Sequence, residues 1–175
     1  FLLAILNEGL PVVCSEDTTL THPLLVSVHG LAQAATMAAE YLARELNGRG
    51  HVLMVGATED TSPTALARIE GFRSVLARYP DIRCTHAGVG WTYDNTLKSL
   101  LQERDEWESG FDGHHIDAIF GISDSLALAG RDAARTLGML DTSTLVVGIN
   151  GDPLALAAIQ TGTMHATVET SPERL

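Results

Sequence analysis

Short apolar runs rich in Val, Ile and Leu alternate along this chain with longer segments in which apolar residues recur every three to four positions. The short runs predict strands and the longer segments predict helices. The expected strands are 10–14, 25–28, 52–55, 83–87, 118–122, 145–149 and 166–168, and the expected helices are 31–46, 63–78, 95–107, 123–137 and 153–160. Residues 103–115 carry charge and two glycines without a clear period, so we expect the second half of that segment to be a surface loop.

The last five predicted strands are each followed by a predicted helix, except the final one. This alternation is typical of the α/β class, with a doubly wound parallel sheet in a Rossmann-like three-layer α/β/α arrangement. Local signals agree with the helices. Ser62 before Pro63 and Ser123 before the fourth helix predict helix starts, and Gly48 and Gly138 predict helix ends.

Composition excludes several classes of protein. With 45% hydrophobic and 19% charged residues, the chain has the composition of a globular domain. The formal net charge of −11 would repel phosphate backbones, so no nucleic acid is expected to contact this segment. No apolar run approaches the roughly 20 residues that a membrane span needs. The start lacks an initiator Met and the features of a signal peptide, so we expect a fragment of a longer polypeptide.

Doubly wound sheets bind ligands at the carboxyl ends of their strands. The polar and aromatic side chains expected there are Trp91, Tyr93, Ser123, Asp124, Asn150, Asp152 and Thr170, with Arg68 one turn into a helix. Such a set suits a sugar or polyol, because each hydroxyl both donates and accepts a hydrogen bond. An aromatic ring can also cover the apolar C–H face of a sugar ring.

Each of these residues also has a purely structural interpretation. Asp124 suits the first turn of a helix as a favourable charge, and Asn150 before Gly151 suits an ordinary turn. Arg68 suits a solvated helix position, and Trp91 suits the core.

An enzymatic alternative is a hydrolase, because Ser123, Asp152 and His165 follow the Ser, Asp, His order of α/β-hydrolases. However, the nucleophile elbow needs a second glycine where this chain has Ser125, which disfavours the hydrolase. Phosphate-binding and dinucleotide-binding glycine motifs are absent from the sequence, and no cofactor is expected.

A metal site is a second alternative. His114 and His115, with Asp112 and Asp117, offer ligands for a divalent metal. Adjacent residues in a loop usually point apart, so a solvated loop is the favoured interpretation and no metal is expected.

Six segments of the chain together carry a resemblance to a known family. They are "GLPVV", "AAEYLAREL", "ARIEGFRSVLARYPDI", "DAIFGISDSLALAGRDAARTLG", "LVVGINGDPLALAAIQTG" and "HATVETSP". In this order they resemble the periplasmic sugar-binding proteins of the ribose-binding type, which have the type I periplasmic binding protein fold. That fold is shared with the effector domains of lactose-repressor-type regulators.

The resemblance implies a protein of two lobes with the ligand in the cleft between them. Residues 1–28 would be the end of the N-terminal lobe and the first hinge crossover. Residues 29–168 would form the C-terminal ligand-binding lobe, and residues 169–175 would begin the return crossover.

The resemblance also implies ligand contacts. Carried over position by position, they fall on Glu16, Arg68, Trp91, Tyr93, Ser123, Asp124, Asn150 and Thr170. Three of these positions depart from the family's usual residues: Ser123 stands for Asn, Asn150 for Asp and Thr170 for Gln. The shorter Ser and Thr side chains leave the identity of the sugar open.

The implied function is non-catalytic binding of a small sugar or polyol, as the solute-binding component of an ABC-type transporter with a membrane permease as partner. That function implies a periplasmic or extracytoplasmic location. The alternative is a ligand-sensing domain of a lactose-repressor-type regulator or of a sensor kinase, which in the repressor case would be cytoplasmic.

Overall fold

The computed structural model describes residues 2–14, 22–27, 30–57, 62–111 and 115–170. In chain order the elements are α1 (Leu2–Asn7), β1 (Val12–Cys14), β2 (Leu25–Ser27), α2 (Leu31–Glu45), β3 (Arg49–Gly56), α3 (Pro63–Leu76), β4 (Asp81–Gly88), α4 (Tyr93–Gln102), α5 (Arg104–Glu108), β5 (Ala118–Gly121), α6 (Asp124–Thr136), β6 (Leu145–Asn150), α7 (Pro153–Gln160) and β7 (Ala166–Glu169). Among the described residues, no helix is long and apolar enough to cross a membrane.

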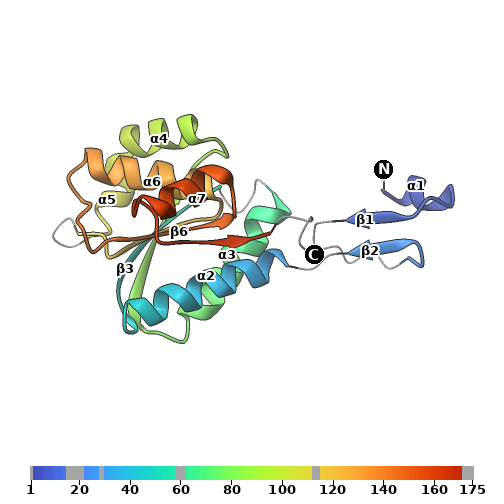
Figure 1. Ribbon diagram of the computed structural model, residues 1–175, viewed down its shortest axis with the longest axis horizontal. Coiled ribbons are helices and arrows are strands. Elements are labelled where there is room, and N and C mark those ends of the chain that lie inside the picture. Colours follow the sequence, from blue (N-terminus) through green and yellow to red (C-terminus); the bar gives the residue numbers. More distant parts are fainter. Residues whose placement is uncertain (1, 15–21, 28–29, 58–61, 112–114, 171–175) are drawn as a thin grey trace.

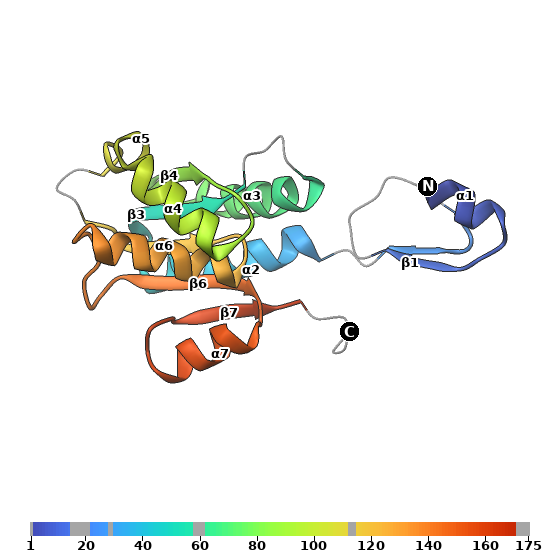
Figure 2. The same ribbon diagram turned by 90° about the horizontal axis from the view of Figure 1, so that it is seen from above.

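Five strands form one parallel sheet in the order β4-β3-β5-β6-β7, which confirms the predicted fold class. β1 and β2 pair in parallel as a separate two-stranded sheet. In Figures 1 and 2 this small sheet lies beyond the carboxyl end of β7, apart from the five-stranded body.

Helices cover both faces of the five-stranded sheet. In Figure 1, α2 and α3 lie below the sheet and α4, α6 and α7 lie above it. Right-handed crossovers require this division, because the connection from β3 to β4 and the later connections run across the sheet in opposite directions.

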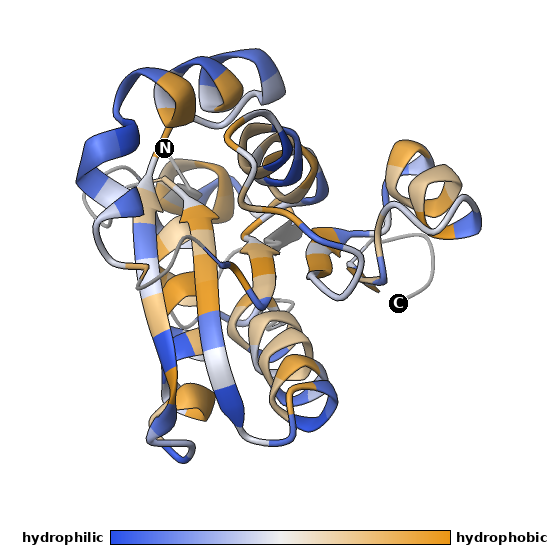
Figure 3. Cartoon of the chain, turned by 90° about the vertical axis from the view of Figure 1, so that its left-hand side faces the viewer, coloured by the Kyte–Doolittle hydropathy of each residue, from blue (hydrophilic) through white to orange (hydrophobic). Residues whose placement is uncertain are grey.

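The core lies between these layers. The central strand β5 is buried along its whole length, as expected for a parallel strand covered on both faces. The ring of Phe72 on α3 stacks on Phe120 of β5 with centroids 3.9 Å apart. Gly71 lets α3 approach α2 closely, since a Cβ there would lie 2.4 Å from the carbonyl oxygen of Ala32. Figure 3 shows the apolar residues gathered on the strands and on the helix sides that face them.

Most predicted helix ends are confirmed. The Ser62 hydroxyl accepts a hydrogen bond from the backbone nitrogen of Ala65 at 3.1 Å. Gly48 and Gly138 adopt φ values of 74° and 70° just beyond their helices, a conformation that favours glycine. Ser123 is the N-cap residue of α6, but its side chain makes no capping bond.

The single helix expected over 95–107 is wrong, because the structure has two helices, α4 and α5, that meet at Glu103. Trp107 is buried, and its indole nitrogen donates to the carbonyl of Leu100 at 3.0 Å. In a continuous helix this carbonyl would accept from the backbone of Arg104. Burial of the indole therefore accompanies the break in the helix.

Candidate functional site

The candidate site lies at the carboxyl edge of the five-stranded sheet, where the connections change direction. β3 pairs with β4 on one side and with β5 on the other. Helices that leave neighbouring strands toward opposite faces open a crevice at the strand ends, and ligands of doubly wound folds bind there.

Arg68 enters this edge from α3. Its side chain is 6% exposed. One terminal nitrogen donates to the carbonyl of Ile122 at 2.5 Å, and the other donates to Oδ1 of Asn150 at 3.1 Å. The Nε–H group is buried and has no hydrogen-bond partner among the described residues. Arg68 therefore ties the end of β5 to the end of β6, and its Nε is the guanidinium nitrogen without a hydrogen bond in the described part of the chain.

Asn150 ends β6 in a strained backbone conformation. Its φ is 132°, a value that residues other than glycine rarely adopt. Gly151 follows with a φ of 77°. The carbonyl of Asn150 accepts from the backbone nitrogen of Thr170 at 3.4 Å. Surrounding contacts must hold such a conformation in place, because it costs about 1 to 3 kcal/mol.

Asp124 begins α6 and turns its carboxylate into the protein. It is 1% exposed. Oδ2 accepts from the backbone nitrogen of Asp152 at 2.8 Å, and Oδ1 accepts from the hydroxyl of Thr167 at 2.6 Å. Both carboxylate oxygens are thus engaged within the protein.

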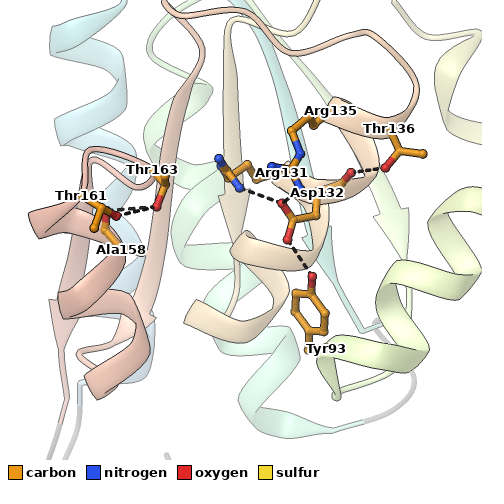
Figure 4. Close-up of polar contacts among 8 residues, drawn as sticks. All are labelled: Tyr93, Arg131, Asp132, Arg135, Thr136, Ala158, Thr161 and Thr163. Carbon is orange, nitrogen blue, oxygen red and sulfur yellow. Dashed lines mark hydrogen bonds and ion pairs between the residues drawn. The ribbon is translucent and has the colours of Figure 1, made fainter.

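The hydroxyl of Tyr93 also has an internal partner. It donates to Asp132 on α6 at 2.6 Å, and Arg131 and Arg135 contact the same carboxylate (Figure 4). The hydrogen bond to Asp132 and burial raise the pKa of Tyr93 to about 12. The Tyr93 hydroxyl is therefore committed to α6.

Ser123 lies close to Asp124 at the start of α6. Its side chain is buried, and its hydroxyl lies 3.1 Å from the hydroxyl of Ser125. The hydroxyl is thus held by a neighbouring hydroxyl, and either oxygen can be the donor.

Two further predicted residues lie at the same edge. Trp91 follows β4 with 39% of its surface exposed, so its ring is available to a ligand and is not a core residue. Thr170 directly follows β7 and is half-buried. Glu16 lies outside the described residues.

A cleft of 560 Å³ opens among the amino-terminal ends of α4, α6 and α7. It is lined by Tyr93, Asp124, Ser125, Leu128, Asp152, Pro153 and Leu154. Sequence reasoning placed Tyr93, Asp124 and Asp152 at this edge and missed the apolar wall formed by Leu128, Pro153 and Leu154.

The charged groups of the site are the buried Arg68 guanidinium and the nearby carboxylates of Asp124 and Asp152. Burial lowers the pKa of Arg68, while Asp124 and Asp152 oppose that change. The guanidinium remains protonated at neutral pH. Burial raises the pKa of Asp124, against hydrogen bonds from Thr167, Asp152 and Gly151 that lower it.

The hydrolase alternative is not supported by the geometry. Ser123 follows β5 at the carboxyl edge, whereas His165 precedes β7 at the amino end of the sheet. The His165 ring accepts a hydrogen bond from the backbone nitrogen of Val146 at 3.0 Å, so it is engaged at that opposite end.

The metal alternative falls partly outside the described residues, since Asp112 and His114 are not among them. His115 lies 3.2 Å from Asp117 and 3.3 Å from Asp141. Within the described part of the chain, no cluster of three or more His, Cys, Asp or Glu side chains is arranged to hold a metal ion.

Two contributors to the site were missed from sequence. The carbonyl of Ile122 has no side-chain signal, because it is a backbone group that α3 happens to reach. Thr167 offered a weak signal, since it is a polar residue between the apolar residues Ala166 and Val168 of the final strand. Its partner Asp124 is far away in sequence, so their pairing was not predictable from local pattern.

The doubly wound fold, with polar groups gathered at its carboxyl edge, is typical of a domain that binds a ligand at that edge, and comparison with known proteins identifies the family. A model of the periplasmic binding protein domain matches residues 4–175, and the chain belongs to that family. The resemblance seen in the sequence is thereby confirmed.

Among curated proteins, the chain is 27% identical over 145 residues to the ribose import binding protein RbsB of Haemophilus influenzae. The match covers 78% of this chain and 44% of that protein. The chain thus spans less than half the length of this relative.

Solved structures share the fold at lower identity. The periplasmic binding protein component of the arabinose ABC transporter from Shewanella sp. ANA-3, bound to L-arabinofuranose, superposes with a TM-score of 0.77 at 20% identity, covering 98% of this chain and 57% of that one. A periplasmic solute-binding protein of an ABC transporter from Actinobacillus succinogenes 130z, with bound D-allose, gives a TM-score of 0.78 at 21% identity, covering 98% and 61%.

Proposed function

We propose that this chain supplies one wall of a sugar-binding cleft in a non-catalytic solute-binding protein of an ABC-type transporter. In this proposal residues 29–168 form the C-terminal lobe, residues 1–28 end the other lobe and cross the hinge, and residues 169–175 begin the return crossover. The ligand is a small sugar or polyol, the partner is a membrane permease, and the protein works outside the cytoplasm.

The observation that carries the proposal is the state of Arg68. A buried guanidinium lies at the strand-switch edge, where its two terminal nitrogens donate to Ile122 and Asn150 and its Nε–H has no hydrogen-bond partner among the described residues, and this arrangement supports a role in holding a ligand there. A planar guanidinium can engage two neighbouring hydroxyls at once. Half-exposed Trp91 at the same edge offers a face for the C–H side of a sugar ring.

The proposed ligand contacts of this lobe are Arg68, Trp91, Ser123, Asn150 and Thr170. Ligand held by both lobes would favour the closed arrangement, because only that arrangement makes both sets of contacts.

The test is a thermal-shift screen of the full-length protein against neutral pentoses, hexoses and polyols, followed by calorimetry on each hit. A ligand at 100 times its Kd adds about 2.7 kcal/mol of stability, which raises Tm by roughly 5 to 10 °C. We expect such a shift with at least one sugar or polyol. No shift across the panel would contradict the proposal.

The same calorimetry on the isolated 175 residues tests whether the second lobe supplies the other wall of the sugar-binding cleft. Half of a site leaves the sugar exposed on one side, so we expect binding at least about a hundredfold weaker, a loss of about 2.7 kcal/mol. Equal affinity of the fragment and the full-length protein would mean that this chain holds a complete site.

A further inference from the structure

Asp124 and Thr167 form a hydrogen-bonded pair beneath the loop that joins β6 to α7. The Thr167 hydroxyl donates to Oδ1 of Asp124 at 2.6 Å and accepts from the backbone nitrogen of Gly151 at 3.1 Å. Oδ2 of the same carboxylate accepts from the backbone nitrogen of Asp152 at 2.8 Å. The backbone N–H groups of Gly151 and Asp152, which are consecutive in the loop, thus donate to Thr167 and Asp124.

A glycine at position 148 makes the space that this pair needs. A Cβ at position 148 would lie 2.3 Å from Oδ1 of Asp124, so only glycine lets the carboxylate reach across β6 to Thr167 on β7. Asp124 reaches this place because it starts α6, where the helix dipole also favours a negative charge.

The loop that the pair holds is the one that carries Asn150. Gly151 and Asp152 directly follow Asn150, whose φ of 132° needs external support. The Asn150 side chain in turn accepts from Arg68 at 3.1 Å. A continuous series of hydrogen bonds and one short stretch of backbone therefore connects Asp124 to the guanidinium.

We infer that Asp124 and Thr167 are positioning residues, which fix the Asn150 amide and through it the Arg68 guanidinium before a sugar arrives. The inference rests on the proposed function. In this inference Asp124 supports the residues that bind the ligand and does not contact the ligand itself, because Asp124 is 1% exposed and both of its carboxylate oxygens are hydrogen-bonded within the protein. A site whose groups are held beforehand loses less conformational freedom on binding.

The test compares Thr167→Val, Thr167→Ser and Thr163→Val in the full-length protein, using calorimetry with the tightest ligand of the sugar panel. Thr163 is a matched control, because its hydroxyl donates to the Ala158 carbonyl at 3.1 Å at the far end of α7 (Figure 4). Each Val variant thus loses one half-buried hydroxyl that has two hydrogen-bond partners, and urea unfolding measures the stability that each has lost.

We expect Thr167→Val to weaken sugar binding about tenfold, the equivalent of about 1.4 kcal/mol, and Thr163→Val to leave it unchanged. Thr167→Ser, which restores the hydroxyl, should return the affinity to within about twofold of wild type. Asp124→Asn, which keeps the shape of the side chain, should weaken binding as Thr167→Val does.

The outcomes separate the inference from the function on which it rests. If the wild-type protein binds sugar and Thr167→Val binds equally well, the positioning role is overturned while the proposed function stands. Equal weakening by the two Val variants, or failure of Thr167→Ser to restore affinity, would point to general loss of stability and also overturn it. Absence of sugar binding by the wild-type protein would overturn the proposed function itself.

Discussion

Replacing Arg68 by alanine removes the group that ties the ends of β5 and β6 together. The change deletes the donors to the Ile122 carbonyl and to Asn150. Hydrogen bonds from a charged donor contribute about 1.5 to 3 kcal/mol each, so the gross loss is about 3 to 6 kcal/mol. Removing the buried, unpartnered Nε–H returns about 1 to 3 kcal/mol. We therefore expect the free energy of unfolding to fall by roughly 3 kcal/mol.

Sugar affinity should fall as well. One lost charge-assisted hydrogen bond to a ligand hydroxyl corresponds to a tenfold or greater weakening, at about 1.4 kcal/mol per decade. The measurement is calorimetry of full-length wild-type and Arg68→Ala protein with the tightest sugar of the panel, and urea unfolding of both. Arg68→Lys, which keeps the charge but not the planar fork, should fall between them.

Arg78→Ala is the matched control. Arg78 follows α3 at its other end and pairs with Glu40 at 3.1 Å, with both side chains 59% exposed. Exposed pairs contribute about 0 to 1 kcal/mol, so stability and affinity should hardly change. Unchanged affinity in Arg68→Ala, or an equal loss in Arg78→Ala, would refute the placement of Arg68 in the site.

Three further changes test other parts of the structure. Phe72→Ala should lower the free energy of unfolding by about 3 to 5 kcal/mol in urea, because the buried ring stacks on Phe120; a loss under 1 kcal/mol would contradict this packing. Tyr93→Phe should lower stability by about 1 kcal/mol yet change sugar affinity by less than about threefold, since the hydroxyl is held by Asp132; a tenfold loss of affinity would instead place it on the ligand. Burial raises the pKa of Asp124, so the folded protein binds the proton of this carboxyl group more tightly than the unfolded chain does. The free energy of unfolding of wild type, relative to that of Asp124→Asn, should therefore fall as pH rises from about 4 through the raised pKa. A difference that is flat with pH in urea unfolding would contradict it.

Much of the fold was predictable from sequence because each strand and helix carries its own local signal. The buried run at β5 and the Ser62 cap are examples, since both depend on residues adjacent in the chain. The break at Glu103 was not predictable, because it accompanies burial of the Trp107 indole, which depends on the tertiary fold.

The candidate site was predictable in position more than in detail. Residues that follow parallel strands must meet at one edge, which placed Asn150 and Asp124 there, and Arg68 reaches the same edge from the first part of α3. The direction in which each polar group points depends on distant partners. Asp124 faces Thr167, and Tyr93 faces Asp132, 39 residues away, so neither orientation could be inferred from the sequence pattern.

We claim that Arg68 belongs to the part of a sugar site that this chain supplies. This claim can be tested at a single group, the Nε–H of Arg68. In full-length protein labelled with 15N-arginine, the Nε–Hε resonance of Arg68 is assigned by its absence from the Arg68→Lys variant and followed while sugar is added. We expect this resonance to shift and to saturate with the calorimetric Kd, while the Arg78 resonance stays in place. Saturation of the protein with an unmoved Arg68 resonance would contradict the claim.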